Sequence, residues 1–249
     1  MSAAVELINV TAGYMGNPVQ RNVSFRVEHG EIVALLGGSG CGKSTMLKTM
    51  IGLLPLISGD ILIEGESIVT CPLSRKRELL RKFGVAFQNG ALFRSYTLAE
   101  NIALPLQEYT DLPQSRIREI VEEKLRIVGL KGAGNKMPGD LSGGMVKRGA
   151  VARALALDPG IIFLDEPSAG LDPLNSANLD KLILKLRQEL NASIIIVTHE
   201  LDSIFTVADR VIFLDSKGCG ILAEGTPADL KENSVNPFVR SFLNRGKEK

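Results

Sequence analysis

The chain has 249 residues, 45% of them hydrophobic and 23% charged, which is enough apolar sequence for the full core of one large domain or of a domain with a subdomain. Its 29 basic and 28 acidic residues leave a net charge of +1, so bulk charge gives no reason to expect nucleic acid as the ligand. Cys41, Cys71 and Cys219 lack zinc or disulfide spacing, and no apolar run reaches the roughly 18 residues of a membrane span. We therefore expect a reducing compartment and no membrane insertion.

Four segments near the N-terminus have β-strand composition and are separated by turn residues: 5–12, 24–30, 31–37 and 60–65. Residues 43–54 have the composition of a helix, so the third of these strands is expected to hand over to a helix within a few residues. The beginning of the chain is thus predicted to be β-rich and to feed into a strand–helix unit.

The segment from residue 97 to residue 157 has no strand pattern. Its apolar residues recur at helical spacing, most clearly in Ile117, Ile120, Val121, Leu125 and Val128. We interpret this segment as a helical insertion.

Two continuous apolar runs, 161–165 and 193–199, lie on either side of a predicted helix. The apolar residues of that helix share one face and are Leu179, Leu182, Ile183, Leu186 and Leu190. Apolar runs separated by a helix are typical of buried parallel strands. The predicted fold class is therefore α/β, and the last residues, 244–249, are expected to form a solvated tail.

Residues 37–44 read GGSGCGKS and fit the phosphate-loop pattern G-x-x-x-x-G-K-[ST] at the predicted strand–helix junction. Such glycines let backbone N–H groups turn toward phosphate oxygens, and the helix N-terminus adds partial positive charge. Lys43 is expected to neutralise the β and γ phosphates and Ser44 to ligate Mg²⁺, while Cys41 contributes only its small size. A glycine-rich turn before a helix is the alternative. The predicted loop residues are Gly37, Gly38, Ser39, Gly40, Cys41, Gly42, Lys43, Ser44 and Thr45.

An acidic pair follows the apolar run 161–164, in the sequence IIFLDEP. Adjacent residues at the end of a strand point in different directions, so Asp165 and Glu166 can have separate roles. Asp165 is expected to hold the metal through its water shell, and Glu166 to orient and deprotonate an attacking water. Taken alone, the pair would only end a strand before the turn at Pro167.

The sequence LSGGM, residues 141–145, precedes a helical pattern. Ser142 is a candidate N-cap, and the unshielded amides of Gly143 and Gly144 could bind an anion. The phosphate loop already supplies one anion site, so a second site is redundant within one subunit but not between two.

This order and spacing of motifs resembles the nucleotide-binding domain of ABC transporters. The resemblance implies a P-loop NTPase fold with a RecA-like core sheet, an N-terminal antiparallel β-subdomain and an inserted helical subdomain. It implies a core of residues 1–88 and 158–230, a helical signature subdomain of 89–157 and a C-terminal tail of 231–249. It also implies a head-to-tail homodimer in which Ser142, Gly143 and Gly144 of one subunit close over the ATP of the other.

Four further positions carry the resemblance. Tyr14 matches the aromatic that stacks on adenine, and Gln88 the glutamine that reaches Mg²⁺ and water beside the helical subdomain. Asp172 matches the loop that crosses to the opposite subunit, although Asp172 before Pro173 is equally a good N-cap. His199 matches the histidine that contacts the γ-phosphate, whereas His29 is given no role.

The segments FQNGALFRSYTLAENIALPL (87–106) and GMVKRGAVARALALDP (144–159) are similar to the phospholipid-transport ATPases of the Mla type, which work with MCE proteins (MlaF-like). The ending NPFVRSFLN, residues 236–244, supports the same resemblance. Met145, where many ABC members have glutamine, occurs in both this type and peptide importers.

The resemblance implies an ATP-hydrolysing subunit, peripheral on the cytoplasmic face of the bacterial inner membrane, that binds ATP and Mg²⁺ and serves phospholipid transport to or from periplasmic MCE proteins. The implied partners are a second copy, integral permease subunits (MlaE-like), an MCE-domain protein (MlaD-like) and a small STAS-domain protein (MlaB-like). Another ABC importer or exporter ATPase, a soluble non-transport ABC ATPase and a non-hydrolysing binding module remain alternatives. This chain does not contact the cargo, so the cargo is inferred from kinship alone.

Overall fold

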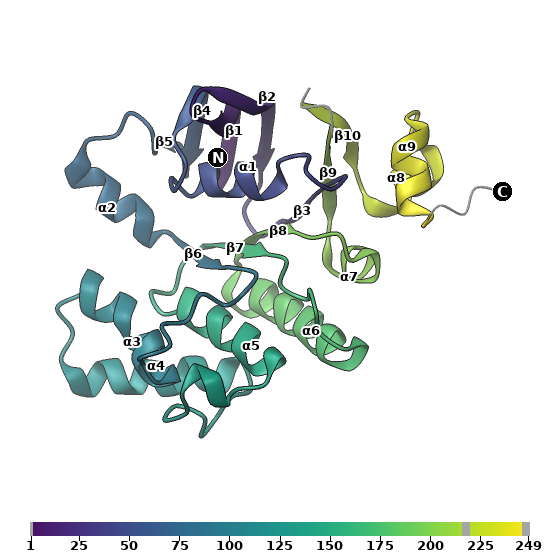
Figure 1. Cartoon of the computed structure of the whole chain (residues 1–249). Coiled ribbons are helices and arrows are strands. Elements are labelled where there is room, and N and C mark those ends of the chain that lie inside the picture. The colour runs from purple at the N-terminus through teal and green to yellow at the C-terminus, as the bar shows by residue number, and fades with distance from the viewer. Residues whose placement is uncertain (1, 216–219, 246–249) are drawn as a thin grey trace.

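The structure is a computed structural model that describes residues 2–215 and 220–245 as two β-sheets with helices between and around them (Figure 1). Cys219 and residues 246–249 of the expected tail lie outside the described residues. Within the described ranges no helix is both long enough and apolar enough to cross a membrane.

The smaller sheet is antiparallel and has the strand order β2-β1-β4-β5. Its strands are β1 (Val5–Tyr14), β2 (Asn17–Val27), β4 (Leu56–Ile63) and β5 (Glu66–Ser67). The β-rich beginning is confirmed, but β2 starts seven residues before the predicted 24–30 and ends at Val27. It ends there because residues 28–31 form a turn, closed by a bond from the Glu31 amide to the Glu28 carbonyl.

The larger sheet has the strand order β10-β9-β3-β8-β7-β6. Its strands are β3 (Ile32–Gly37), β6 (Phe83–Ala86), β7 (Ile161–Asp165), β8 (Ser193–Val197), β9 (Arg210–Leu214) and β10 (Ile221–Gly225). All neighbours are parallel except β10 on β9. The predicted buried parallel strands are therefore confirmed, whereas β6, β9 and β10 were not predicted.

Alternate residues of the central strands face opposite sides of this sheet. On β7, Ile161 and Phe163 join the core under the antiparallel sheet, whereas Ile162 and Leu164 join the core under the helices. Both faces are covered, which explains why these strands read as continuous apolar runs.

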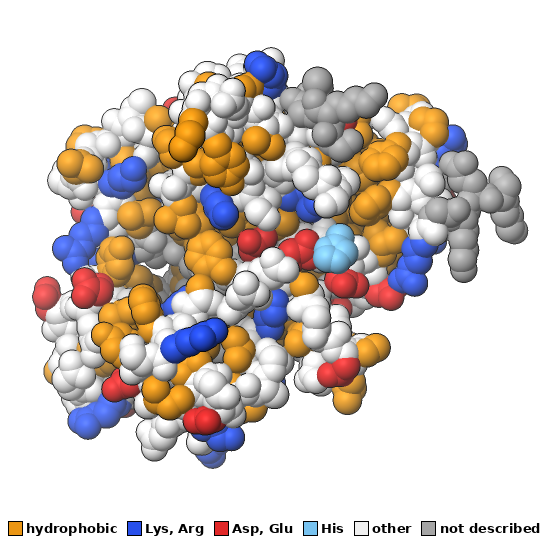
Figure 2. Space-filling view, in the orientation of Figure 1, with side chains coloured by type: hydrophobic (Ala, Val, Ile, Leu, Met, Phe, Trp, Pro, Cys, Tyr) orange, Lys and Arg blue, Asp and Glu red, His pale blue; other side chains and the backbone are white. Residues whose placement is uncertain are grey.

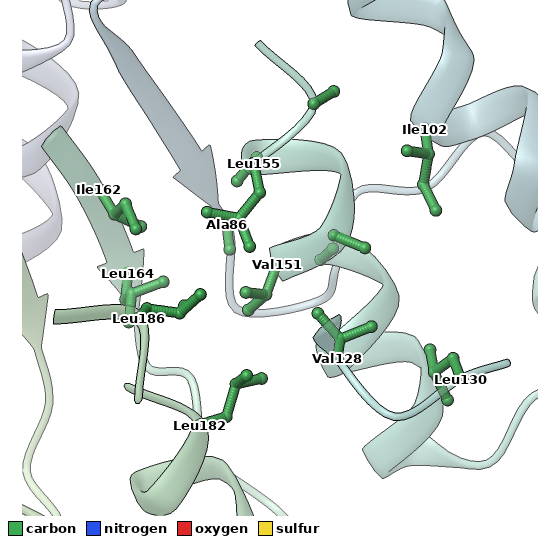
Figure 3. Packing of buried hydrophobic residues seen from close by; sticks show 14 of the residues in the cluster. Ala86, Ile102, Val128, Leu130, Val151, Leu155, Ile162, Leu164, Leu182 and Leu186 are labelled. Carbon is green, nitrogen blue, oxygen red and sulfur yellow. The ribbon is translucent and has the colours of Figure 1, made fainter. Parts of the chain in front are cut away.

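The core on one face of this sheet is shared with α3 (Leu98–Tyr109), α4 (Gln114–Ile127), α5 (Gly143–Ala154) and α6 (Pro173–Leu190). The 3₁₀ turn η1 (Pro138–Asp140), between α4 and α5, has no buried residue. Figure 3 shows where these helices meet the sheet: Val151 of α5 and Leu155, which directly follows α5, pack beside Ala86 of β6, and Leu182 and Leu186 of α6 pack near β7. The helical interpretation of 97–157 is confirmed, since no strand occurs there.

The remaining helices are α1 (Lys43–Met50), α2 (Leu73–Arg81), α7 (Leu201–Val207), α8 (Pro227–Asn233) and α9 (Pro237–Leu243). The apolar side chains of α1 belong to the core shared by the two sheets. This helix is shorter than the predicted 43–54 because a tight turn, closed by the Gly52 amide on the Thr49 carbonyl, follows Met50. Helices α8 and α9 pack against β9 at the far side of the molecule from α3 to α5 (Figure 1).

Candidate nucleotide site

An open cavity of about 710 Å³ lies at the carboxyl ends of β3, β7 and β8. In open α/β sheets this edge is where ligands usually bind. Figure 2 shows acidic and basic side chains and a histidine gathered at the middle of the face on view. The cavity is lined by Tyr14, Val19, Gly37, Ser39, Gly40, Gly42, Lys43, Ser44, Thr45, Gln88, Glu166, His199 and Phe242.

The phosphate-loop segment joins β3 to α1 and forms one wall of the cavity. Gly42 precedes α1 in the left-handed conformation, with φ 96°, which favours glycine there. The Lys43 ammonium donates to the carbonyls of Gly37 at 2.9 Å and Gly38 at 3.2 Å, so its charge lies over the loop. With no acidic residue in the first turn of α1, the loop and helix N-terminus present donors and positive charge suited to phosphate.

A buried glutamine on β2 supports the loop from behind. The Gln20 amide donates to the Cys41 carbonyl at 2.6 Å and to the Asp215 carbonyl at 2.8 Å. Cys41 is 1% exposed, faces away from the cavity, and burial raises the pKa of its thiol. The expectation that Cys41 matters for its size fits this placement. Gln20 was not among the predicted site residues, although a polar residue inside a strand is a signal in the sequence.

The first acidic residue lies beneath the loop. The Ser44 hydroxyl donates to Asp165 Oδ1 at 3.4 Å. Burial, and next the negative charge of Glu166, raise the pKa of Asp165, while Ser44, Lys48 and Lys147 act in the opposite direction. A hydroxyl beside a carboxylate whose charge is poorly compensated is a donor set suited to a hard cation such as Mg²⁺.

The second acidic residue turns the other way, as predicted. Glu166 has φ 45°, a left-handed conformation that costs a residue with a Cβ about 1–3 kcal/mol. Its Oε1 lies 2.9 Å from His199 Nδ1, so the two predicted catalytic side chains are in contact. Its Oε2 is buried and finds no hydrogen-bond partner in the described residues. An unpaired buried carboxylate oxygen facing a polar cavity is placed to accept a hydrogen bond from water.

The other cavity walls come from distant parts of the chain. Tyr14, 47% exposed at the end of β1, lies near Thr45, whose hydroxyl is 3.4 Å from the tyrosine oxygen. Gln88 lies just beyond β6. Phe242 of α9 also lines the cavity and was not predicted, because nothing in the local sequence of a C-terminal helix indicates which distant loop it will meet.

The predicted trans residues lie outside this cavity, around the N-termini of α5 and α6. Ser142 caps α5 through its hydroxyl, which accepts from the Met145 amide at 3.3 Å, and both Ser142 and Gly143 are exposed. Asp172 caps α6 by accepting from the amides of residues 174 and 175, and these hydrogen bonds lower its pKa. Both predicted N-caps are confirmed.

The two N-termini are neighbours. A Cβ added to Gly144 would lie 3.2 Å from Oδ1 of Asn175 in the first turn of α6. The structure therefore brings the residues predicted to act in trans together and separates them from the cavity of their own subunit. Ser142, Gly143 and Asp172 are exposed, but Gly144, which was also predicted to be unshielded, is buried beside Asn175 of α6.

Comparison with known proteins identifies relatives over nearly the whole chain. The sequence profile described as ABC transporter matches residues 20–169. The probable ribonucleotide transport ATP-binding protein mkl of Mycobacterium leprae is 43% identical over 244 residues, covering 98% of this chain and 70% of that protein. The intermembrane phospholipid transport system ATP-binding protein MlaF of Haemophilus influenzae is 40% identical over 232 residues, covering 92% of this chain and 86% of the relative.

Solved structures of ATP-binding cassettes have the same fold as this chain. A dimeric ATP-binding cassette in a post-hydrolysis state with ADP and Pi is 31% identical, with a TM-score of 0.81 over 89% of this chain and 98% of its own. The cbiO1 protein of Clostridium perfringens, part of the ABC transporter complex cbiONQ, is 28% identical, with a TM-score of 0.83 over 98% of this chain and 97% of its own.

Proposed function

Since this chain belongs to the ABC transporter family, as an ATP-binding subunit that hydrolyses ATP, we propose that it drives a transporter of phospholipid. The observation that carries the catalytic part is the single cavity into which Lys43, Ser44, Gln88, Glu166 and His199 all converge. The division into a core (1–88 and 158–230), a helical subdomain (89–157) and a tail (231–249) is part of the same proposal.

ATP binds with its phosphates along residues 37–45 and its adenine against the ring of Tyr14. Backbone amides of the loop and the ammonium of Lys43 neutralise the phosphate charge. An exposed aromatic ring at the cavity rim suits a purine, because stacking needs an open ring face.

Ser44 and Asp165 are proposed to hold Mg²⁺, with Gln88 reaching the same place from β6. When bound, this ion would neutralise charge on the phosphate oxygens. The raised pKa of Asp165 supports the assignment, because a buried carboxylate without adequate compensation is stabilised by a cation.

Glu166 is proposed to take the proton from the attacking water. His199 contacts Oε1, so Oε2, which is buried and unpaired in the described residues, is the oxygen left for the water. His199 is proposed to fix this carboxylate and to contact the γ-phosphate of bound ATP. Positioning of this kind provides most of the rate enhancement in phosphoryl transfer.

The second anion site is proposed to act in trans. Ser142 and Gly143 present a capped helix N-terminus to solvent, and with the buried Gly144 and with Asp172 they are separate from their own subunit's cavity. A head-to-tail homodimer would place them over the partner's ATP, and the structural relative in the post-hydrolysis state is itself dimeric.

The proposed transporter assembly consists of this subunit twice, on the cytoplasmic face of a bacterial inner membrane, with permease subunits and an MCE-domain protein, and with a STAS-domain protein as an accessory. Its cargo is phospholipid. Support comes from the MlaF proteins of Haemophilus influenzae and Escherichia coli, which are 40% identical and of whose length the match covers 86% and 81%.

Ribonucleotide is the second candidate cargo, because the mkl proteins of mycobacteria carry that description at 43% identity. Those relatives extend well beyond the matched region, since it covers 67–70% of their length. The catalytic cavity is the same under either cargo, so only the assembled transporter distinguishes them.

The test is a pull-down from detergent-solubilised native membranes with the Glu166→Gln protein trapped by ATP, followed by mass spectrometry of proteins, lipids and nucleotides. The matched control is Glu189→Gln, a change to an exposed glutamate on α6. Recovery of a permease with an MCE-domain protein and enriched phospholipid is expected. A permease with enriched ribonucleotide, or soluble partners only, would exclude the phospholipid proposal.

A further inference from the structure

A lysine on the helix that follows LSGG contacts the main chain of the proposed catalytic base. The Lys147 ammonium, on α5, donates to the carbonyl oxygen of Glu166 at 2.8 Å. We propose that Lys147 is a positioning residue that holds Glu166 in its reactive orientation. The inference rests on the proposed function, in which Glu166 is the base and Ser142 serves the partner's ATP.

The main chain of Glu166 needs such support. Its φ of 45° is unfavourable for a residue with a side chain, and such conformations persist where surrounding contacts determine them. The Glu166 amide donates to the Val197 carbonyl at 2.7 Å, which fixes one side of the residue to β8. Lys147 fixes the carbonyl on the other side, where the Ala169 amide also donates at 3.3 Å. Among the described residues, loss of the lysine would leave the carbonyl with only the longer contact to the Ala169 amide.

The charges around Lys147 also suit this role. Its ammonium is partly buried, and burial lowers its pKa, while the carboxylates of Glu166 and Asp165 oppose that shift. A cation near two carboxylates favours their charged forms. Lys147 therefore acts on both the orientation of Glu166 and the charge around it.

The position of Lys147 connects two ATP sites. Ser142 caps the helix that carries Lys147 five residues later, a rise of roughly 7.5 Å along one rigid element. In the proposed dimer, Ser142 contacts the partner's ATP while Lys147 contacts the base of its own subunit. A shift of α5 caused by nucleotide at one site would therefore reach Glu166 at the other site.

The first experiment compares Lys147→Met, which removes the donor, with Lys147→Arg, which keeps one, in steady-state ATP hydrolysis by the assembled transporter. We expect Lys147→Met to lower kcat at least tenfold, with KM and fluorescent-ATP binding within twofold of the parent, and Lys147→Arg to recover most of kcat. Lys181→Met, at an exposed lysine on α6, is the control. Thermal melting confirms that each variant is folded.

A kcat of Lys147→Met within twofold of the parent overturns the inference. Equal defects in the Met and Arg variants, or a loss that appears only in KM, overturn it as well. A parent protein without ATP turnover would instead contradict the proposed function, so the two failures are distinguishable.

Mixed dimers test whether Lys147 acts within its own subunit. Ser142→Arg in one subunit leaves a single active site, which uses the Glu166 of that same subunit and the Ser142 of its partner. Lys147→Met is then expected to lower turnover when it shares the subunit with Ser142→Arg, and to spare it when placed in the partner. Equal loss from both placements would overturn the inference.

Discussion

The cavity at the edge of the large sheet and the exposed N-terminus of α5 are both suited to bind phosphate, but they differ in completeness. The cavity combines the phosphate loop, the Lys43 ammonium and the Glu166 carboxylate within one subunit, and Asp165, the residue before Glu166 at the end of β7, contacts Ser44 of the loop. The α5 terminus offers only the Ser142 cap and Gly143 to solvent. The difference indicates that one site can bind ATP alone, whereas the other contributes to catalysis only when a second subunit supplies the nucleotide.

The largest expected effect is the loss of turnover when the proposed base is removed from the complete site, the cavity. Glu166→Gln keeps the shape of the side chain but cannot accept a proton, so we expect ATP binding to persist and turnover to fall by about two to four powers of ten. Steady-state phosphate release measures this, with Glu189→Gln as the control. Turnover within tenfold of the parent would show that Glu166 is not the base.

The next largest effect is expected from a substitution in the incomplete site, at the N-terminus of α5. Ser142→Arg fills the exposed α5 terminus, so hydrolysis by the dimer should fall by about two to three powers of ten, as for the loss of a charge-stabilising donor. ATP binding to the isolated subunit should stay within twofold, because the cavity is untouched. Ser115→Arg, at an exposed position of α4, is the control. Equal loss of ATP binding by the isolated subunit would refute the trans placement.

A smaller effect, on stability, is expected where the helix α5 packs against strand β6 of the large sheet. A Cβ at Gly84 of β6 would lie 2.0 Å from the Ala154 carbonyl at the end of α5, so Gly84→Ala must push the helix away from the sheet. Such overpacking typically costs about 1–3 kcal/mol of unfolding free energy. Thermal melting should show a Tm about 2–4 °C lower for each kcal/mol lost.

Gly139→Ala is the control for this change, because a Cβ at Gly139 meets nothing within 4 Å. An unchanged Tm for Gly84→Ala would mean that β6 and α5 can separate without loss of packing.

The smallest expected change is a rise in melting temperature, caused by a substitution that also removes activity. Burial and the charge of Glu166 raise the pKa of Asp165, so at neutral pH the charged carboxylate opposes folding. Asp165→Asn should therefore raise the Tm of the nucleotide-free protein, by about 2–4 °C for each kcal/mol gained, while abolishing Mg²⁺-dependent hydrolysis.

Because folding raises the pKa of Asp165, the effect of Asp165→Asn on Tm should depend on pH. A carboxyl whose pKa is raised by folding opposes folding above that pKa, and the penalty disappears as the pH falls toward the value of an unfolded aspartate, about 3.9. The Tm advantage of Asp165→Asn should therefore be largest near pH 7 and vanish near pH 4. A lower Tm than the parent at pH 7 would contradict it.

The sequence by itself determined the elements whose signals are local. The phosphate loop needs glycines at fixed spacing, the caps at Ser142 and Asp172 bond amides two or three residues away, and β7 and β8 are continuous apolar runs. Each signal lies within one segment, so its chemistry and its secondary structure could be predicted together.

Only the tertiary structure decided which segments meet. His199 pairs with Glu166 across 33 positions of the sequence, and Lys147 contacts the Glu166 carbonyl across 19. Phe242 lines the same cavity as the phosphate loop, which lies far from it in the sequence. Strand β6 was likewise not predicted, because its four residues become a strand only through pairing with β7. Such contacts depend on how sheets and helices pack, and this packing cannot be predicted from the pattern within one segment.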